Sequence, residues 1–284
     1  PDNISNNVER GKKADTEAAI ASAARVVKRR YVITRVHAQY MEPRGTLGVY
    51  DPGEDRLTLY ADVQYPHRVR NMLAQNVFKV PESKMRVIAQ DVGGGFGTKG
   101  WQYVEHRLTM YAARKVGRPV KWVGTRAETF FSDHHGRGVK LYGELALDKQ
   151  GTFLGLRIQW IINAGAYLSS PGGFTNTLPP SGNIMSIYKT PVVHGLHRLV
   201  LTNTTATTPY RGAARPNVSY LVERLVDEAA AEMGLDRVEL RRRNLITREA
   251  FPYKNPIGVE YDTGDPVGLI DKAAQFSDWA GFEK

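Results

Sequence analysis

The chain has 284 residues, which is long enough to bury a sizeable hydrophobic core in one large domain or in two smaller ones. Its 42% apolar and 24% charged residues are ordinary for a globular protein, and no apolar run approaches the ~20 residues of a membrane span. Because the chain contains no cysteine, disulfides, thiolate metal sites and iron–sulfur ligation within it are excluded.

The formal net charge is +10 and the isoelectric point is near 9.7, values that can indicate a nucleic-acid partner. The positive residues are scattered, however, with short clusters at 12–13, 28–30 and 241–243. Three consecutive residues on a helix point in different directions, so the last cluster is no single stripe. No nucleic-acid-binding motif accompanies these clusters, and we expect no nucleic acid as a partner.

The first elements predicted along the chain are a helix and a hairpin. The Ala-rich stretch 16–27, capped by Asp15, predicts a helix that leads into an extended run over 31–36. The stretches 46–50 and 56–64 predict two strands around a Pro-Gly turn. Gln64 ends the second strand on its polar face, where a positioned side chain can meet a site.

A glycine-rich run follows the apolar strand predicted at 85–89. Residues 90–100 are QDVGGGFGTKG, with four glycines in five positions, and an amphipathic helix is predicted over 101–116 with a core-facing apolar stripe. Glycines let backbone N–H groups approach a ligand and allow positive φ. A strand, a glycine loop and a helix N-terminus together predict a site for a phosphate or another oxyanion. The alternative is a turn that only connects the strand and the helix.

The run also contains GxGxxG over 95–100, the fingerprint of a dinucleotide-binding fold. That fold requires an acidic residue about 20 positions further on, at the end of the next strand, and here the next apolar run, 120–123, is followed by no carboxylate until Glu128. Arg126 could serve a 2′-phosphate, so an NADP-binding fold remains a rival interpretation.

Later elements mix strands and helices. Strict alternation over 139–147 and 153–162 predicts a hairpin, 171–182 is typical of a long loop, and a strand is predicted over 200–204. A helix over 217–233 should end at Gly234. We therefore predict an α+β fold with mixed sheets and hairpins packed by helices, in two lobes at about 1–135 and 136–284. The histidines at 134, 135, 194 and 197 lack the spacing of a metal site.

The glycine run resembles the molybdopterin-contacting loop of the molybdenum hydroxylases, the family of xanthine dehydrogenase, aldehyde oxidase and the large subunit of aerobic carbon monoxide dehydrogenase. Five further segments resemble the family in the same order. These are Met41–Gly45, Val63–His67, Asn163–Tyr167, Pro209–Pro216 and Gly234–Asn244. The resemblance extends over roughly residues 30 to 282 and implies the molybdopterin-binding region of such an enzyme.

The resemblance also implies roles for particular residues. Gln64 corresponds to the glutamine beside the metal, whose amide can donate to a metal ligand, and Phe96 shields the metal. The cofactor would be held by Gly93, Gly94, Gly95, Phe96, Gly97, Gly212 and Ala213. Arg211 or Arg215 could hold an anionic substrate, a structural salt bridge of Arg211 being the alternative. No residue of the chain is expected to ligate the metal.

Two departures from the family pattern matter. Carbon monoxide dehydrogenases carry a copper-binding cysteine in the loop that here contains Gly212, Ala213 and Ala214. The family's catalytic base is a glutamate in a Gly-Glu-Pro setting, and this triplet is absent. Copper-dependent oxidation of carbon monoxide is therefore not expected, and the base should lie outside this chain.

The implied complete enzyme hydroxylates an aldehyde or an N-heterocycle with water-derived oxygen. Its molybdenum would be bound to molybdopterin in the cytosine dinucleotide form, and electrons would pass to partner subunits that carry iron–sulfur clusters and FAD. The chain starts at Pro1, so we expect a fragment that is inactive alone and that needs the remaining half of its subunit, or a naturally split subunit. A bacterial cytoplasmic location is expected, with the periplasm left open. The rival class is a non-catalytic or NADP-binding module.

Overall fold

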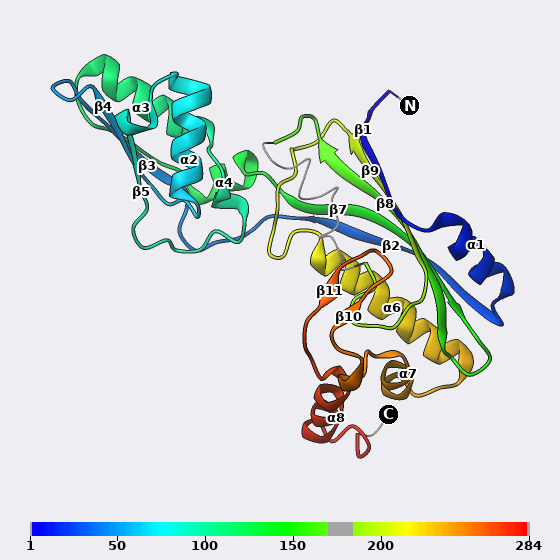
Figure 1. Cartoon of the computed structure of the whole chain (residues 1–284). Coiled ribbons are helices and arrows are strands. Elements are labelled where there is room, and N and C mark those ends of the chain that lie inside the picture. Colours follow the sequence, from blue (N-terminus) through cyan, green and yellow to red (C-terminus); the bar gives the residue numbers. More distant parts are fainter. Residues whose placement is uncertain (1, 170–183, 283–284) are drawn as a thin grey trace. The chain divides into compact units, whose positions relative to one another are not determined.

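The computed structural model describes residues 2–169 and 184–282, which form two compact units (Figure 1). The smaller unit comprises 36–136 and 205–211, and the larger comprises 1–35, 137–204 and 212–284. The expected lobes, 1–135 and 136–284, share the break near residue 136 but differ from these units elsewhere. The first 35 residues belong with the later part of the chain because strand β2 (Arg25–Val36) lies beside β7 (Gly136–Leu147) in one sheet.

A four-stranded sheet forms the base of the smaller unit, in the order β5-β4-β3-β6. Its strands are β3 (Gly45–Asp51), β4 (Arg56–Ala61), β5 (Met85–Ile88) and β6 (Val120–Val123). β3 is antiparallel to β4 and β6, whereas β4 and β5 are parallel. The hairpin and the strand before the glycine run are confirmed. A dinucleotide-binding fold needs a parallel sheet around that run, so the mixed sheet argues against the rival interpretation.

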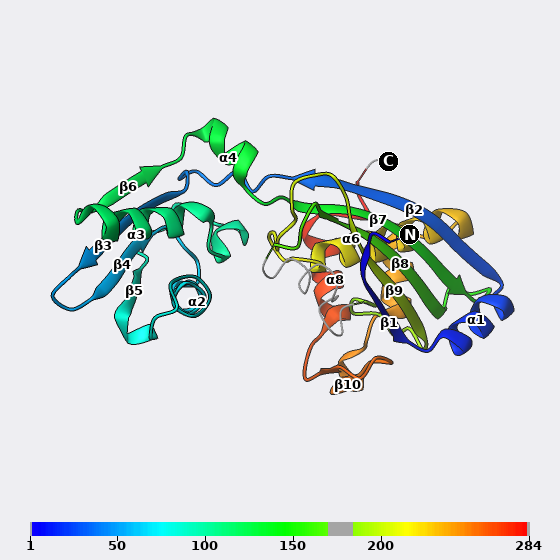
Figure 2. The same cartoon turned by 90° about the horizontal axis from the view of Figure 1, so that it is seen from above.

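The helices of the smaller unit are α2 (Pro66–Met72), α3 (Val104–Val116) and α4 (Arg126–Ser132). Figure 2 shows α2 and α3 beside the strands. Leu57 and Leu59 of β4 pack in one buried cluster with Val69 of α2 and Met110 of α3. Helix and sheet approach closely at Gly48, where a Cβ atom would lie 2.5 Å from the backbone of Thr109. This packing fixes the ends of the strands from which the site is built.

Two predictions about α3 were wrong. The helix begins at Val104, because residues 98–100 form a separate 3₁₀ turn and the Tyr103 N–H is capped by Nδ1 of His106 at 3.2 Å. Its N-terminus is therefore not adjacent to the glycines.

The predicted apolar stripe of α3 is also not core-facing. Val104, Leu108, Tyr111 and Val116 are each more than half exposed. The helix instead buries a mixed face: Met110 and Ala113 are fully buried, Glu105 pairs with the buried Arg44, and Thr109 meets Thr46 at 3.3 Å. An amphipathic pattern tells which face is apolar, but not whether the sheet lies under it.

The larger unit contains a five-stranded sheet in the order β1-β9-β8-β7-β2. The remaining strands of this sheet are β1 (Ile4–Gly11), β8 (Phe153–Gly165) and β9 (Val193–Leu201). The predicted hairpin is confirmed as the antiparallel pair β7–β8, and β8 runs parallel to β9. The strand predicted over 200–204 lies mostly N-terminal of that range. The first helix, α1 (Lys13–Ser22), is shorter than predicted because β2 starts at Arg25 and buries Val27 in the core.

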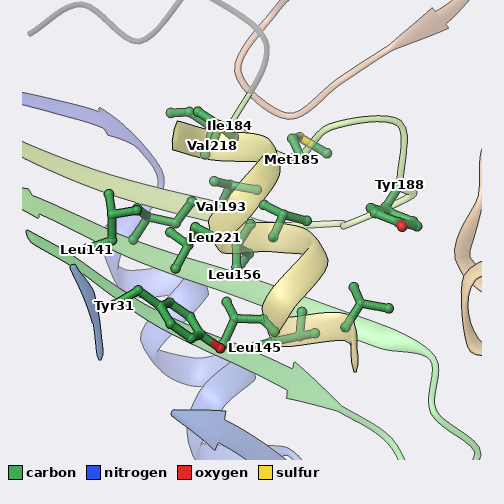
Figure 3. Packing of buried hydrophobic residues seen from close by; sticks show 14 of the residues in the cluster. Tyr31, Leu141, Leu145, Leu156, Ile184, Met185, Tyr188, Val193, Val218 and Leu221 are labelled. Carbon is green, nitrogen blue, oxygen red and sulfur yellow. The ribbon is translucent and has the colours of Figure 1, made fainter. Parts of the chain in front are cut away.

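Helix α6 (Arg215–Met233) packs across this sheet. As predicted, it ends at Gly234, with φ +66°, and it begins two residues before the predicted start at 217. Val218 and Leu221 of the helix face Leu141, Leu145 and Leu156 of the strands (Figure 3). The chain continues through α7 (Arg237–Asn244), β10 (Tyr253–Lys254), β11 (Glu260–Tyr261) and α8 (Pro266–Phe276). The fold is α+β with mixed sheets, as expected. The long loop predicted over 171–182 lies outside the described residues.

None of the helices described, in 2–169 and 184–282, combines the length and the apolar character that crossing a bilayer requires.

A buried histidine makes the larger unit sensitive to acid. The side chain of His197 is fully buried against Trp160, with the ring centroids 4.8 Å apart. Burial lowers the pKa of His197 to about 4. Because the unfolded chain binds this proton near pH 6.5, the unfolded state gains protons first as the pH falls, and the native state loses stability between pH 6.5 and 4.

Replacing His197 with Leu should therefore flatten the pH dependence of unfolding. The wild-type chain should lose up to about 3 kcal/mol through this group between pH 6.5 and 4, and the variant should not. Urea unfolding at a series of pH values measures the difference. His67→Leu, at an exposed position, is the control, and an unchanged slope in His197→Leu would contradict the assignment.

Candidate functional site

Gln64 lies three residues beyond the end of β4 and contacts the glycine run with both its side chain and its backbone. Its Oε1 accepts a hydrogen bond from the Gly97 N–H at 2.8 Å, and its own N–H donates to the Lys99 carbonyl at 3.0 Å. With the amide oxygen engaged by Gly97, the two N–H donors of Nε2 are the groups that Gln64 can offer to a ligand.

The glycine run, residues 93–97, is irregular, and two of its glycines adopt positive φ: +96° at Gly94 and +100° at Gly97. Phe96 also has positive φ, +49°, a conformation that costs energy in a non-glycine residue and clusters at functional sites. Phe96 is 42% exposed. The run therefore presents an aromatic ring at the surface of a strained backbone segment.

The glycines are required because other segments approach the backbone where their side chains would be. A Cβ atom at Gly95 would lie 2.6 Å from Oε1 of Gln64, and one at Gly97 would lie 2.4 Å from the Pro209 carbonyl oxygen. Gly95 itself does not adopt positive φ. A larger residue at Gly95 would thus first displace Gln64.

The predicted 209–213 loop meets the glycine run through its first residues. The Arg211 N–H donates to the Phe96 carbonyl at 2.8 Å, and the guanidinium carbon of Arg211 lies 5.8 Å from the centroid of the Phe96 ring. The smaller unit thus brings together Gln64, Phe96, Gly97 and Arg211. Arg211 also has positive φ, +26°.

Gly212 and Ala213, the other predicted residues of this loop, belong to the larger unit. Both adopt positive φ, +90° and +52°, and the Ala213 carbonyl accepts a hydrogen bond from Arg137. Their backbone is therefore strained and locally fixed within that unit.

Charged residues that the sequence did not identify lie beneath the glycine run. Lys99 is 1% exposed, and its ammonium group contacts the carboxylates of Glu42 and Asp62. Burial raises the pKa of Asp62, and the neighbouring Lys99 opposes this shift. Glu42 and Lys99 lie inside segments already noted for their resemblance, but spacing alone does not pair them.

Two buried hydroxyl groups near the glycine run suit a polar ligand. Oγ1 of Thr98 and Oγ1 of Thr208 are buried without a hydrogen-bond partner within the described part of the chain. Buried polar groups normally have partners, so unsatisfied ones mark places where a ligand or water completes the bonding. Together with the strained backbone of Gly94, Phe96 and Gly97, this fits a cofactor rich in oxygen acceptors and donors.

Residues 2–169 and 184–282 contain no group of three or more histidine, aspartate or glutamate side chains arranged to hold a metal ion.

Comparison with known proteins identifies the family. The model of the molybdopterin cofactor-binding domain matches residues 1–245. The chain thus belongs to the molybdopterin-binding subunits of the molybdenum hydroxylase family.

Individual relatives agree with this assignment. The chain is 36% identical over 276 residues to the carbon monoxide dehydrogenase large chain of Hydrogenophaga pseudoflava, covering 95% of this chain and 34% of the relative. It is 34% identical over 284 residues to subunit gamma of the 6-hydroxypseudooxynicotine dehydrogenase complex of Paenarthrobacter nicotinovorans, covering 96% and 35%. The quinoline 2-oxidoreductase structure from Pseudomonas putida 86 superposes with a TM-score of 0.92 at 32% identity, covering 99% and 36%. The chain therefore spans about a third of the length of these relatives.

The close approach at Gly97 can be tested by adding one methyl group. Gly97→Ala should cost about 3 kcal/mol, because its Cβ meets the Pro209 carbonyl and φ is positive. Gly117→Ala is the matched control, since it has φ +64° with no atom within 4 Å and should cost only about 1 kcal/mol. Urea unfolding of the chain gives both values, and equal costs would contradict the packing argument.

Proposed function

We propose that this chain forms part of the catalytic subunit of a molybdenum hydroxylase that oxidises an aldehyde or an N-heterocycle. When bound, the molybdenum cofactor would supply two-electron oxidation and the transfer of water-derived oxygen. Family membership supports the class of cofactor. The observation that carries the proposal for this site is the hydrogen bond that joins Gln64 to Gly97, which puts a side-chain amide beside a bare backbone loop.

The residues of the chain have distinct roles in this proposal. The glycine run, residues 93–97, would hold the pterin. The Gly93 and Gly97 N–H groups are engaged by Glu42 and Gln64, so the N–H groups of residues 94–96 between them would face the cofactor. Gln64 would donate from Nε2 to an oxygen ligand of the metal. The exposed ring of Phe96 would limit the access of water to that ligand. The donors are fixed before the ligand binds, which is the arrangement that favours developing negative charge.

Arg211 would orient the substrate. Its backbone N–H is bonded to Phe96, so the start of its side chain is fixed next to the ring. A guanidinium group beside an aromatic face suits a substrate that is aromatic or carries partial negative charge, such as the oxygen or ring nitrogen of the proposed classes. Gly212 and Ala213 stay proposed cofactor-binding residues of the larger unit.

Copper-dependent oxidation of carbon monoxide is not the reaction we propose, although two relatives carry that name. The loop has Gly212, Ala213 and Ala214, and the chain contains no thiol to bind copper. The names of other relatives, including nicotine 6-hydroxylase and nicotinate dehydrogenase, support N-heterocycles as a substrate class.

The proposal also includes partners. Relatives are named as subunits or large chains of complexes, which supports assembly with further polypeptides. We propose that these carry iron–sulfur clusters and FAD, and that the remainder of the subunit supplies the catalytic base and the rest of the pterin site. The cofactor is proposed to be the cytosine dinucleotide form.

The role of Gln64 predicts different results for two substitutions. Gln64→Glu keeps an oxygen for the Gly97 N–H but loses the amide donors and adds negative charge, so molybdenum content should persist while kcat falls on the order of 10²-fold. Gln64→Ala also loses the contact with Gly97, so molybdenum content should fall as well. Metal analysis and steady-state kinetics on aldehydes and N-heterocycles in the assembled enzyme distinguish the two.

Gln75→Ala, at an exposed position in the same unit, is the control and should change neither quantity. A wild-type kcat in Gln64→Glu would contradict the proposed role of Gln64. Full activity toward carbon monoxide would overturn the proposed substrate class.

A further inference from the structure

A loop of glycines has few side chains with which to hold its own shape, so contacts from elsewhere must fix it. At its beginning, the Gly93 N–H donates to Oε2 of Glu42 at 2.7 Å, and the Glu42 N–H donates to the Gly93 carbonyl at 3.2 Å. At its end, the ammonium group of Lys99 lies 3.1 Å from the same Oε2 atom. One carboxylate oxygen therefore receives hydrogen bonds from both ends of the run.

The ammonium group of Lys99 is engaged by protein groups. It donates hydrogen bonds to the Glu42 carbonyl at 2.8 Å and to Oε2 of Glu42, and it forms an ion pair with the carboxylate of Asp62. The ring of Tyr40 lies against it, 4.4 Å from Nζ to the centroid. A lysine in a glycine-rich loop suggests a phosphate contact, but this side chain is 1% exposed and surrounded by protein groups.

Asp62 links this cluster to the sheet. It directly follows β4, and its Oδ1 accepts a hydrogen bond from the Gly45 N–H, at the start of β3, at 3.1 Å. Two adjacent strands of the sheet, β3 and β4, therefore fix the position of Lys99 through Asp62, and the loop itself does not.

We propose that Lys99 is a positioning residue, which closes the glycine run through Glu42 and anchors it to the sheet through Asp62. These contacts of Lys99 with Glu42 and Asp62, together with the hydrogen bonds between Glu42 and Gly93, are called the tie below. The tie sets the distance between Gly93 and Lys99, and therefore the directions of the peptide groups and of the Phe96 ring between them. Its importance for catalysis rests on the proposed function, in which this run holds the pterin; its effect on the shape of the run does not.

The test needs a variant that loses the tie without burying an unpaired charge. Lys99→Met alone leaves the carboxylates of Asp62 and Glu42 without their cation, so it is expected to unfold readily. Lys99→Met combined with Asp62→Asn removes one charge of each sign. Glu42→Gln is the second variant, which keeps the shape of the side chain and weakens the shared bond. Lys115→Met, at an exposed position on α3, is the control.

Hydrogen exchange measured by mass spectrometry on the whole chain reports the shape of the run directly. In the double variant and in Glu42→Gln, the amides of residues 93–100 should exchange up to about tenfold faster, since one lost or weakened hydrogen bond contributes at most about that factor. Exchange in the larger unit and in Lys115→Met should remain at wild-type rates. Wild-type exchange of residues 93–100 in both variants would overturn the proposal, as would equal acceleration throughout the chain.

The assembled enzyme separates this inference from the proposed function. If both hold, the variants with fast exchange should show a lowered kcat at nearly unchanged KM, because donors are misdirected while Arg211 remains in place. If exchange accelerates but molybdenum content and kcat stay at wild-type values, the tie stands and the glycine run is not the cofactor cradle. Conversely, if residues 93–100 exchange at wild-type rates while kcat is lowered, Lys99 has another role and the positioning inference is overturned.

Discussion

The arrangement of the site depends on burying one ammonium group. Lys99 is removed from water, and such a charge is stable only where acceptors surround it. The acceptors come from the segment before β3 and from the residue that follows β4, so satisfying Lys99 draws both segments under the glycine run. Gln64 is two residues beyond Asp62, and its contact with Gly97 follows from the same approach. A single electrostatic requirement thus orders the surroundings of a backbone that has no side chains of its own.

A second buried cation organises the neighbouring part of the smaller unit. Arg44 is 2% exposed and contacts Glu105, the carboxylate of Asp133 at 2.7 Å and Oγ of Ser132 at 2.6 Å. Its guanidinium group also stacks over Tyr103 at 3.7 Å. Because this network lies under α3, the helix turns the side that carries Glu105 inward. The exposed apolar stripe is therefore a consequence of the charges below it rather than an exception to amphipathic packing.

The parts of the fold that sequence could predict are those set by local pattern. Alternation identified β7 and β8, and the glycine run with its flanking strand was visible because backbone exposure requires glycine. Gln64 and Phe96 were singled out by their motifs, and the structure places the Gln64 side chain against Gly97, the residue after Phe96. Their roles stay a prediction. The partners of Lys99 were not predictable, because Glu42 and Lys99 are 57 residues apart and neither carries a spacing signal. The prediction of which face of α3 is buried was wrong for the same reason, since the burial of a charge depends on partners distant in sequence.

The order of segments along the chain has a consequence for synthesis. The smaller unit consists of 36–136 and a short later segment, 205–211, which carries Arg211. A ribosome completes β7, β8 and β9 of the larger unit before this segment is made, so the contact between Arg211 and Phe96 is among the last to become available. Contacts of such long sequence separation form late and slowly. The glycine run can therefore reach its final form only after most of both units have been synthesised.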